Sequence, residues 1–248
     1  MRNIFLNNLS ELHQLLGGFS GASVGHSNQL SWVLCKPNHW PDSVIGNPGI
    51  DGIQEVADKM EIGLLPPFLV VPLSEIEEQL PLFRQNGLRE VFRWEAMSLK
   101  SADFCPCNEI IKGYEVKSVD DEQILNDWIG IIKQVLMQNK IISEQVLNGM
   151  FQHPDVTLMV GYFNNQPVSA GMVFVREGVA GLYFIATLSE YQRRGLGAVL
   201  VSRLIQDSFS KGANEIILQA SVAGKKLYLK LGFIPEGEIS VFWKLGKY

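Results

Sequence analysis

Residues 156–210 hold three strand patterns in succession, followed by a helix pattern. The strands are expected at 156–163, 167–176 and 179–188, and the turns between them are short enough for hairpins. Residues 193–210 then carry apolar side chains at helical spacing, the strongest helix pattern in the chain. This part of the sequence therefore predicts an antiparallel meander that leads into a long helix.

The elements around this meander complete a longer series. Two helices are expected before it, with Asp120 and Ser143 as N-caps, because their side chains accept hydrogen bonds from free helix amides. The order from residue 113 onward is then ααβββαβαβ. The expected ranges are 120–140 and 143–150 before the meander, and 215–220, 222–231 and 239–245 after the long helix.

The first half of the chain is also predicted to mix helices and strands. Residues 64–72 and 91–99 have strand patterns, and residues 73–85 between them have a helix pattern. Lys112-Gly113 is a natural linker, so we expect a domain boundary there. The sequence thus predicts an α/β fold in two domains. The expected domains are 1–112 and 113–248.

Landmarks of the two halves recur at one fixed separation. The pairs are Gly52 and Gly197, Gly87 and Gly232, and Leu82-Phe83 and Leu227-Tyr228, each 145 positions apart. A separation shared by three landmarks indicates a duplicated unit. Coincidence among common residues is the alternative interpretation.

Composition and charge exclude several classes of protein. Apolar residues make up 46% and charged residues 19% of the chain, the balance of a folded globular protein. The net charge is −5 and Lys and Arg are not clustered, so no nucleic-acid partner is expected. No apolar stretch approaches the ~18 residues of a membrane-spanning helix, and polar residues interrupt any signal-peptide core. We therefore expect a cytoplasmic protein with no membrane partner.

The cysteines and histidines do not form a metal-binding pattern. The three cysteines are an odd number without CxxC spacing, so neither a disulfide framework nor a zinc site is expected. The four histidines lack HxxxH or HxxE spacing. No metal is predicted.

The segment QRRGLGA, residues 192–198, joins the last meander strand to the long helix. The first amides of a helix have no partner within it, so phosphate oxygens are suitable acceptors. Gly195 and Gly197 remove the Cβ atoms that would hold a diphosphate away from this backbone, and Arg193 and Arg194 add positive charge. The segment therefore predicts a diphosphate seat, with a solvated basic turn as the alternative.

Two other phosphate-binding patterns are absent from this segment. A dinucleotide-binding turn needs a third glycine in GxGxxG, and Ala198, Val199 and Leu200 do not supply it. The GxxxxGK[ST] loop for nucleotide triphosphates is absent as well. Neither alternative therefore accounts for the segment.

The pattern Q-x-x-G-x-G after a meander strand resembles the cofactor motif of the GNAT superfamily of acetyl-CoA-dependent N-acetyltransferases. Residues 221–233, SVAGKKLYLKLGF, are similar to a second motif of that family, N-x-x-A-x-x-L-Y-x-x-x-G-F. Ser221 and Gly224 stand where Asn and Ala are usual. The matching positions are Leu227, Tyr228, Gly232 and Phe233.

The resemblance covers residues 113–248 and includes the order of elements. It implies a largely antiparallel, mixed sheet flanked by helices, preceded here by a degenerate copy of the same kind. It also implies an enzyme that moves an acetyl group from acetyl-CoA directly to a primary amine of a small molecule, amino acid or peptide. The alternatives are a non-catalytic acyl-CoA sensor and an enzyme that acetylates a protein partner.

The same resemblance implies where the cofactor binds. Two strands would splay apart to admit the pantetheine arm, with backbone groups of Ile185 and Thr187 bonding it. Gln192 and Ser221 are further expected cofactor contacts. The diphosphate would rest on the backbone of Arg193, Arg194, Gly195, Gly197 and Ala198.

Tyr228 is the one catalytic residue that the resemblance implies, as the partner of the departing sulfur. Tyrosine is a weaker acid than a thiol, so a hydrogen bond to the thiolate is as plausible as proton transfer. A core aromatic residue is the alternative role. The general base is unassigned, with Glu177, Tyr183 and Glu190 as nearest candidates. The strand expected at 179–188 contains no Asp or Glu. The absence of a carboxylate there favours acceptor amines of low pKa over lysine side chains.

The first half lacks the corresponding chemistry. Phe83 stands at the position of Tyr228 and has no proton to give, and the glycine segment shrinks to PGIDG at 48–52. We expect this half to be inactive and to shape the acceptor pocket or a subunit contact.

Overall fold

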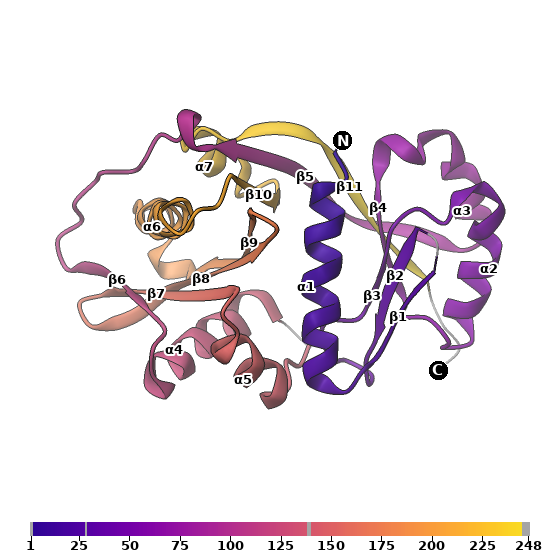
Figure 1. Cartoon of the computed structure of the whole chain (residues 1–248), viewed down its shortest axis with the longest axis horizontal. Coiled ribbons are helices and arrows are strands. Elements are labelled where there is room, and N and C mark those ends of the chain that lie inside the picture. Colours follow the sequence, from indigo (N-terminus) through magenta and orange to yellow (C-terminus); the bar gives the residue numbers. More distant parts are fainter. Residues whose placement is uncertain (1, 28, 138–139, 245–248) are drawn as a thin grey trace.

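The computed structural model describes residues 2–27, 29–137 and 140–244. Within them the strands form a single sheet of eleven, in the order β1-β2-β3-β4-β11-β5-β10-β9-β8-β7-β6 (Figure 1). The strands are β1 Ser23–Ser27, β2 Leu30–Leu34, β3 Ser43–Ile45, β4 Phe68–Pro72, β5 Leu88–Lys100, β6 Tyr114–Ser118, β7 Val156–Phe163, β8 Gln166–Arg176, β9 Val179–Thr187, β10 Glu215–Ala220 and β11 Ile234–Lys244.

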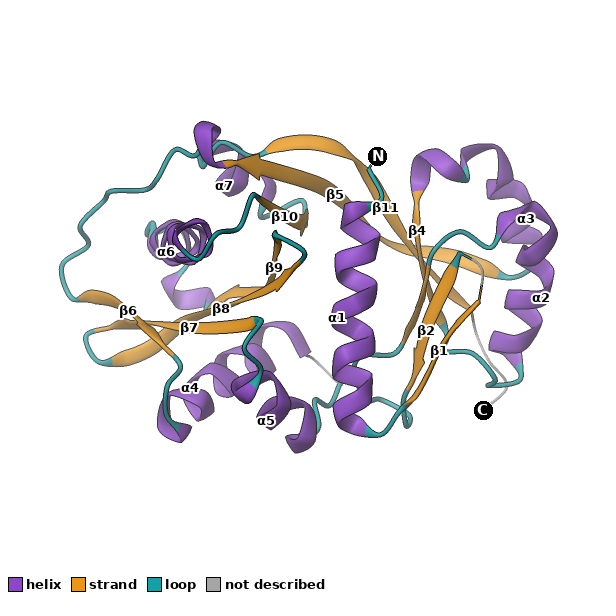
Figure 2. Cartoon of the chain, viewed as in Figure 1, coloured by secondary structure: helices purple, strands orange, loops and turns teal. Residues whose placement is uncertain are grey.

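Helices cover both faces of this sheet (Figure 2). In the second half, α4 and α5 pack on one face and α6 and α7 on the other, each with its own cluster of buried apolar side chains. Helix α1 packs against α5, β2 and β9, so it touches both halves. The described helices include none long and apolar enough to cross a membrane. The α-helices are α1 Ile4–Ser20, α2 Gly49–Glu61, α3 Leu80–Gln85, α4 Glu122–Ile132, α5 Glu144–Gln152, α6 Leu196–Ser210 and α7 Lys225–Lys230.

The last strand of each half is inserted beside strands of the other half. Strand β5 lies between β10 and β11 and is antiparallel to both. Strand β11 in turn pairs with β4 of the first half. The sheet is therefore continuous between the two halves, and each half depends on a strand from the other.

The two halves share one series of elements. The order β1-β2-β3-α2-β4-α3-β5 is repeated by β7-β8-β9-α6-β10-α7-β11, and the parallel pair β3–β4 corresponds to β9–β10. Helices α3 and α7 begin at Leu80 and Lys225, at the separation of 145 seen in the sequence. Gly87 and Gly232, which follow them, both have positive φ, 74° and 97°. This repetition is what a duplicated unit predicts.

Several expected elements differ in extent. The helix expected at 73–85 is two 3₁₀ turns, Leu73–Glu75 and Glu77–Gln79, followed by the short α3, because Pro81 cannot donate within an α-helix and fits only its first turn. Residues 114–118, for which no element was expected, form strand β6 at the sheet edge.

The helix expected at 120–140 is also shorter than predicted. Asp121 rather than Asp120 caps it, accepting a hydrogen bond from the Ile124 amide, and the α-helix passes into a π-helical turn at Lys133–Met137. The last part of the expected range includes residues 138–139, which lie outside the described residues, as does residue 245 of the last expected strand. Ser143 caps α5 as expected.

Candidate functional site

Strands β9 and β10 run in parallel and then separate. Their pairing ends at Leu182 and Leu218, while β9 continues along β8 to Thr187. Just beyond the separation, Phe184 has a φ of 52°, and the register between β8 and β9 shifts at this point. A bulge of this kind bends a strand and redirects its backbone groups. The sheet is therefore open on the β10 side of a bulged strand.

A cleft of about 890 Å³ lies at this opening. Val135, from the π-helical turn after α4, lines it and packs with the core on the α4 and α5 face. Leu227, from α7, lines it and packs with the core on the opposite face. The cleft thus has walls from both faces of the sheet. A site in which two ligands approach each other from opposite faces needs such an arrangement.

Most of the residues expected at the cofactor lie together in this cleft. They come from the end of β9, the turn before α6, the first turn of α6, the end of β10 and α7. Those that line it are Ile185, Thr187, Gln192, Arg193, Gly195, Gly197, Ala198, Ser221 and Tyr228.

The start of α6 offers free backbone amides to the cleft. Gly195, the N-cap, has a φ of 81° and Arg193 a φ of 60°, so the chain turns sharply into the helix. Within the described residues, the amides of Arg193, Gly195 and Gly197 donate no hydrogen bond, whereas that of Ala198 donates to the Gly195 carbonyl at 2.9 Å. Unpaired helix-start amides form a ready anion site. This turn can bind a phosphate group.

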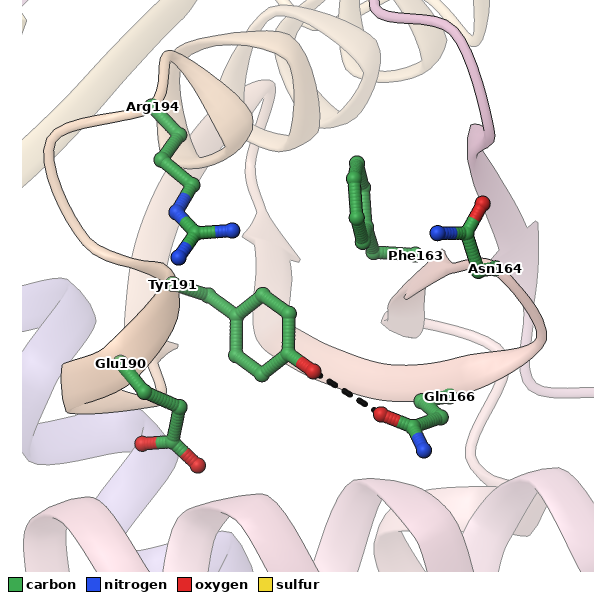
Figure 3. A pocket seen from close by; sticks show the side chains of 6 residues that line it. All are labelled: Phe163, Asn164, Gln166, Glu190, Tyr191 and Arg194. Carbon is green, nitrogen blue, oxygen red and sulfur yellow. Dashed lines mark hydrogen bonds between the residues drawn. The ribbon is translucent and has the colours of Figure 1, made fainter.

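Arg194 points away from the cleft. Its guanidinium lies over the ring of Tyr191, 5.2 Å from the centroid, in a neighbouring pocket of about 360 Å³ (Figure 3). The Tyr191 hydroxyl donates to Oε1 of Gln166 at 2.8 Å there, and Phe163 stands across the pocket. Arg194 therefore lines the neighbouring pocket and not the cleft.

Gln192 supports the turn from within the chain. Its Nε2 donates to the carbonyl of Thr187 at 3.0 Å, which ties the turn to the end of β9. This bond holds the helix start beside the strand that borders the opening. The side chain of Gln192 thus positions the seat for an anion.

Glu109 lies against the same turn and was not expected there. The segment 104–112 runs from α7 to α6, since the Cys105 amide donates to the Leu231 carbonyl at 3.0 Å and the Cys107 amide to Ser202 Oγ at 2.9 Å. Oε2 of Glu109 then stands 3.0 Å from the point where a Cβ on Gly195 would be. A carboxylate therefore stands at the turn whose amides are free.

Tyr228 joins the core and the cleft. Its ring packs edge-on against Phe233, with centroids 5.6 Å apart, and 7% of the residue is exposed. Burial raises the pKa of its hydroxyl well above the usual value. The hydroxyl is therefore a better hydrogen-bond donor to a developing anion than a source of a full proton.

The three candidates for a general base lie elsewhere. Glu177 is in the turn before β9, at the opposite end of that strand from Thr187. Tyr183 is committed to Asn8, to whose Oδ1 it donates at 2.7 Å, and burial raises its pKa. Glu190 lines the neighbouring pocket and accepts a hydrogen bond from Ser189.

At the corresponding helix start of the first half, the first backbone amide is already hydrogen-bonded. Oδ1 of Asn47 accepts a hydrogen bond from the Gly49 amide at 2.9 Å, and Pro48 has no amide hydrogen. Asp51 adds a negative charge in the first turn of α2. Phe83 is buried against Phe242, with ring centroids 4.7 Å apart. The first amide of α2 is therefore occupied, and the charge of Asp51 disfavours an anion at this helix start.

The described residues contain no group of three His, Cys, Asp or Glu side chains that is able to hold a metal ion.

Comparison with known proteins extends these observations. Residues 116–242, just over half of the chain, match the family model of an acetyltransferase (GNAT) domain. The chain is 27% identical over 125 residues to the uncharacterised protein YyaT of Bacillus subtilis (strain 168), an alignment that covers 48% of this chain and 81% of that protein.

Solved structures share the fold over nearly the whole chain. A GCN5-related N-acetyltransferase from Kribbella flavida superposes with a TM-score of 0.72 at 16% identity, covering 98% of this chain and 96% of that one. One from Sphaerobacter thermophilus gives 0.64 at 13% identity, covering 96% and 91%. At such identities the likeness concerns the fold alone. It confirms the expected mixed α/β class and includes the first half.

Proposed function

The chain belongs to the GNAT family of acetyltransferases, and we propose that it transfers an acetyl group from acetyl-CoA directly to a primary amine. Membership of the family supports acyl transfer as the reaction. The acceptor that we propose is a small molecule, an amino acid or a peptide. We also propose that the protein acts in the cytoplasm, as its composition predicts.

The observation that carries this proposal is the cleft with free amides at one end and Tyr228 inside it. A diphosphate on the amides of Arg193, Gly195 and Gly197 gains hydrogen bonds, and the dipole of α6 adds ~0.3–1 kcal/mol. From there the pantetheine arm has an open path between β9 and β10, past Ile185 and Thr187. Its sulfur then comes near Tyr228.

In the proposed reaction, the amine nitrogen bonds to the thioester carbon and the carbon–sulfur bond breaks. Backbone amides near the bulge at Phe184 stabilise the negative charge that develops on the carbonyl oxygen. At reference pKa values, proton transfer from tyrosine to a thiolate is already uphill by ~2 kcal/mol. Burial makes Tyr228 a still weaker acid, so we propose that it stabilises the thiolate by a hydrogen bond.

We assign the two segments of the chain different roles. Residues 113–248 carry the cofactor seat, and residues 1–112 are a degenerate copy that completes the acceptor side. Trp40 of the first half supports this division, because its ring lies 4.9 Å from that of Phe184 at the bulge. The Trp40 amide also donates to the Ile141 carbonyl at 2.9 Å, near the π-helical turn that lines the cleft.

Thiol release tests the proposal. The full chain is incubated with acetyl-CoA and, in turn, 2-phenylethylamine, histamine, putrescine and glycinamide, and free CoA is measured with a thiol reagent. Thiol that appears only with an amine, together with the acetylated amine by mass spectrometry, is the expected result. Binding of CoA without thiol release from any amine would indicate the non-catalytic sensor instead.

A further inference from the structure

A buried carboxylate oxygen without a partner lies beside the end of β10. Among the described residues, the buried side-chain atoms that make no hydrogen bond are Gln79 Oε1, Glu95 Oε2 and Gln219 Nε2. Glu95 lies opposite Ala220 where β5 pairs with β10, whereas Gln219, opposite Ala96, points to the other face of the sheet. Gln79 lies apart from them, in a 3₁₀ turn of the first half.

The end of β10 borders the opening of the sheet. Ala220 is the last residue of β10, two positions beyond Leu218, where β10 parts from β9. The next residue, Ser221, lines the cleft. The residue between Glu95 and the opening is thus Ala220, and its side chain is a single methyl group. On the same face of the sheet, Ala220 packs with Tyr228 in one core cluster.

One oxygen of Glu95 is already held. Nζ of Lys225, the first residue of α7, lies 2.8 Å from Oε1. The ion pair fixes the carboxylate beside the helix that carries Tyr228 three residues later. Its other oxygen, Oε2, is buried and has no partner.

A buried carboxylate oxygen without a partner is costly, and native structures rarely keep one without a reason. A donor supplied by a ligand removes this cost. The acceptor of the proposed reaction is an amine, which carries such donors. We propose that Oε2 of Glu95 binds the acceptor nitrogen and takes its proton, so that the first half supplies the general base; this assignment rests on the proposed function.

In the proposed step, a protonated amine gives one proton to Oε2 of Glu95, and the nitrogen lone pair then bonds to the thioester carbon. The carbon–sulfur bond breaks, and the electron pair stays on sulfur, which Tyr228 stabilises. The second nitrogen proton leaves to solvent as the amide forms, and the thiolate and Glu95 return to their resting protonation by exchange with water.

Glu238 provides a matched control. It faces Glu95 from β11, but 49% of its side chain is exposed and its carboxylate pairs with Arg93 at 3.5 Å. Glu95, by contrast, has a side chain that is 21% exposed and one oxygen fully buried. Replacement of either glutamate with glutamine keeps the shape of the side chain and removes the basic carboxylate.

The experiment compares Glu95→Gln and Glu238→Gln in the full chain, with acetyl-CoA and the amine of the four above that reacts fastest. We expect kcat/KM for the amine to fall by about 100-fold in Glu95→Gln and by less than twofold in Glu238→Gln. The Kd for CoA, measured by calorimetry, should stay within twofold in both variants, which also shows that they fold.

The pH profile separates a proton acceptor from a structural residue. Without a carboxylate to take the proton, only the neutral amine reacts, so kcat/KM of Glu95→Gln should rise about tenfold per pH unit below the pKa of the amine. The wild type should show a flatter profile over the same range. A Glu95→Gln enzyme with wild-type turnover and an unchanged pH profile would overturn the assignment of Glu95 as the base and leave the proposed function standing. Failure of the wild type to turn over any of the amines would overturn the proposed function and this assignment with it.

Discussion

Glu95 on β5 and Lys225 on α7 form an ion pair of 2.8 Å, which joins a strand of the first half to a helix of the second half. The pair joins the inserted strand of the first half to the helix that carries Tyr228. It is one contact of a larger exchange, in which β5 lies between β10 and β11. The site of the second half is therefore built on a strand that the first half provides.

Removal of the first half should abolish folding of the second. A fragment of residues 113–248 lacks β4 and β5, which leaves one edge of β10 and both edges of β11 unpaired and removes the buried Met97 and Leu99 from the core under α6. We expect the fragment to aggregate or remain unfolded, because unpaired apolar strand edges associate. Circular dichroism and size-exclusion chromatography provide the measurement. A monomeric, folded fragment that binds CoA as the full chain does would contradict the exchange.

Glu109 should weaken CoA binding in the wild type. Its carboxylate stands beside Gly195 at the proposed diphosphate seat, so the two negative charges repel each other. We expect Glu109→Gln to lower the Kd for CoA by about fivefold, roughly 1 kcal/mol, and to leave binding of pantetheine, which has no phosphate, unchanged. Calorimetry checks both. Glu115→Gln, on β6 and paired with Lys117, serves as the control and should have no effect.

Loss of the Tyr228 hydroxyl should slow the reaction without weakening cofactor binding. Tyr228→Phe removes the hydroxyl and keeps the ring that packs against Phe233, so it removes little from the folded state. We expect thiol release to fall by about 10- to 100-fold and the Kd for CoA to stay within twofold. Tyr162→Phe, which loses a bond to Asp127 outside the cleft, should keep full turnover. Equal losses in the two variants would show that the effect is structural.

His13 should make stability depend on pH. Burial lowers its pKa to about 4, and its Nδ1 lies 2.8 Å from Ser43 Oγ. The unfolded chain, with a pKa near 6.5, therefore binds the proton first, so the free energy of unfolding falls as the pH drops from about 6.5 to about 4, by up to roughly 3 kcal/mol.

Asp42 acts in the opposite direction, because burial raises its pKa to about 6 and the folded state then binds a proton before the unfolded state does. The wild-type curve alone thus does not isolate His13. Urea unfolding of wild type and His13→Asn between pH 7 and pH 4.5 does so through their difference. We expect this difference to shrink as the pH falls; a constant difference would contradict a neutral, buried His13.

The fold and the glycine turn before α6 were largely predictable because their signals are local. The meander alternates over short distances, the long helix has a clear period, and the segment from Gln192 to Ala198 carries its glycines and arginines in one place. Ser143 also signals its helix by residue type alone. Each of these features depends on neighbours within a few positions.

The missed features depend on distant parts of the chain. The insertion of β5 is a pairing between residues more than a hundred positions apart, for which alternation in one strand holds no information. The placement of Glu95 beside Ala220 follows from that pairing. Glu109 lies beside Gly195 because of the path of the irregular segment 104–112. The guanidinium of Arg194 lies over the ring of Tyr191 and not in the cleft. Pattern and propensity do not specify these contacts.

Binding of the CoA diphosphate by the free amides at the start of α6 is tested by calorimetric titration of CoA into wild type, Gly195→Ala and Gly197→Ala. Gly195 has a φ of 81°, which strains alanine, whereas a Cβ on Gly197 would lie 3.4 Å from Thr187 Oγ1 and 4.0 Å from Leu227 Cδ2, which are ordinary contacts. We predict binding in the micromolar range for the wild type, a loss of about tenfold or more in Gly195→Ala, and a change within about threefold in Gly197→Ala. Failure of wild type to bind CoA at millimolar concentration, or equal affinity in Gly195→Ala, would contradict it.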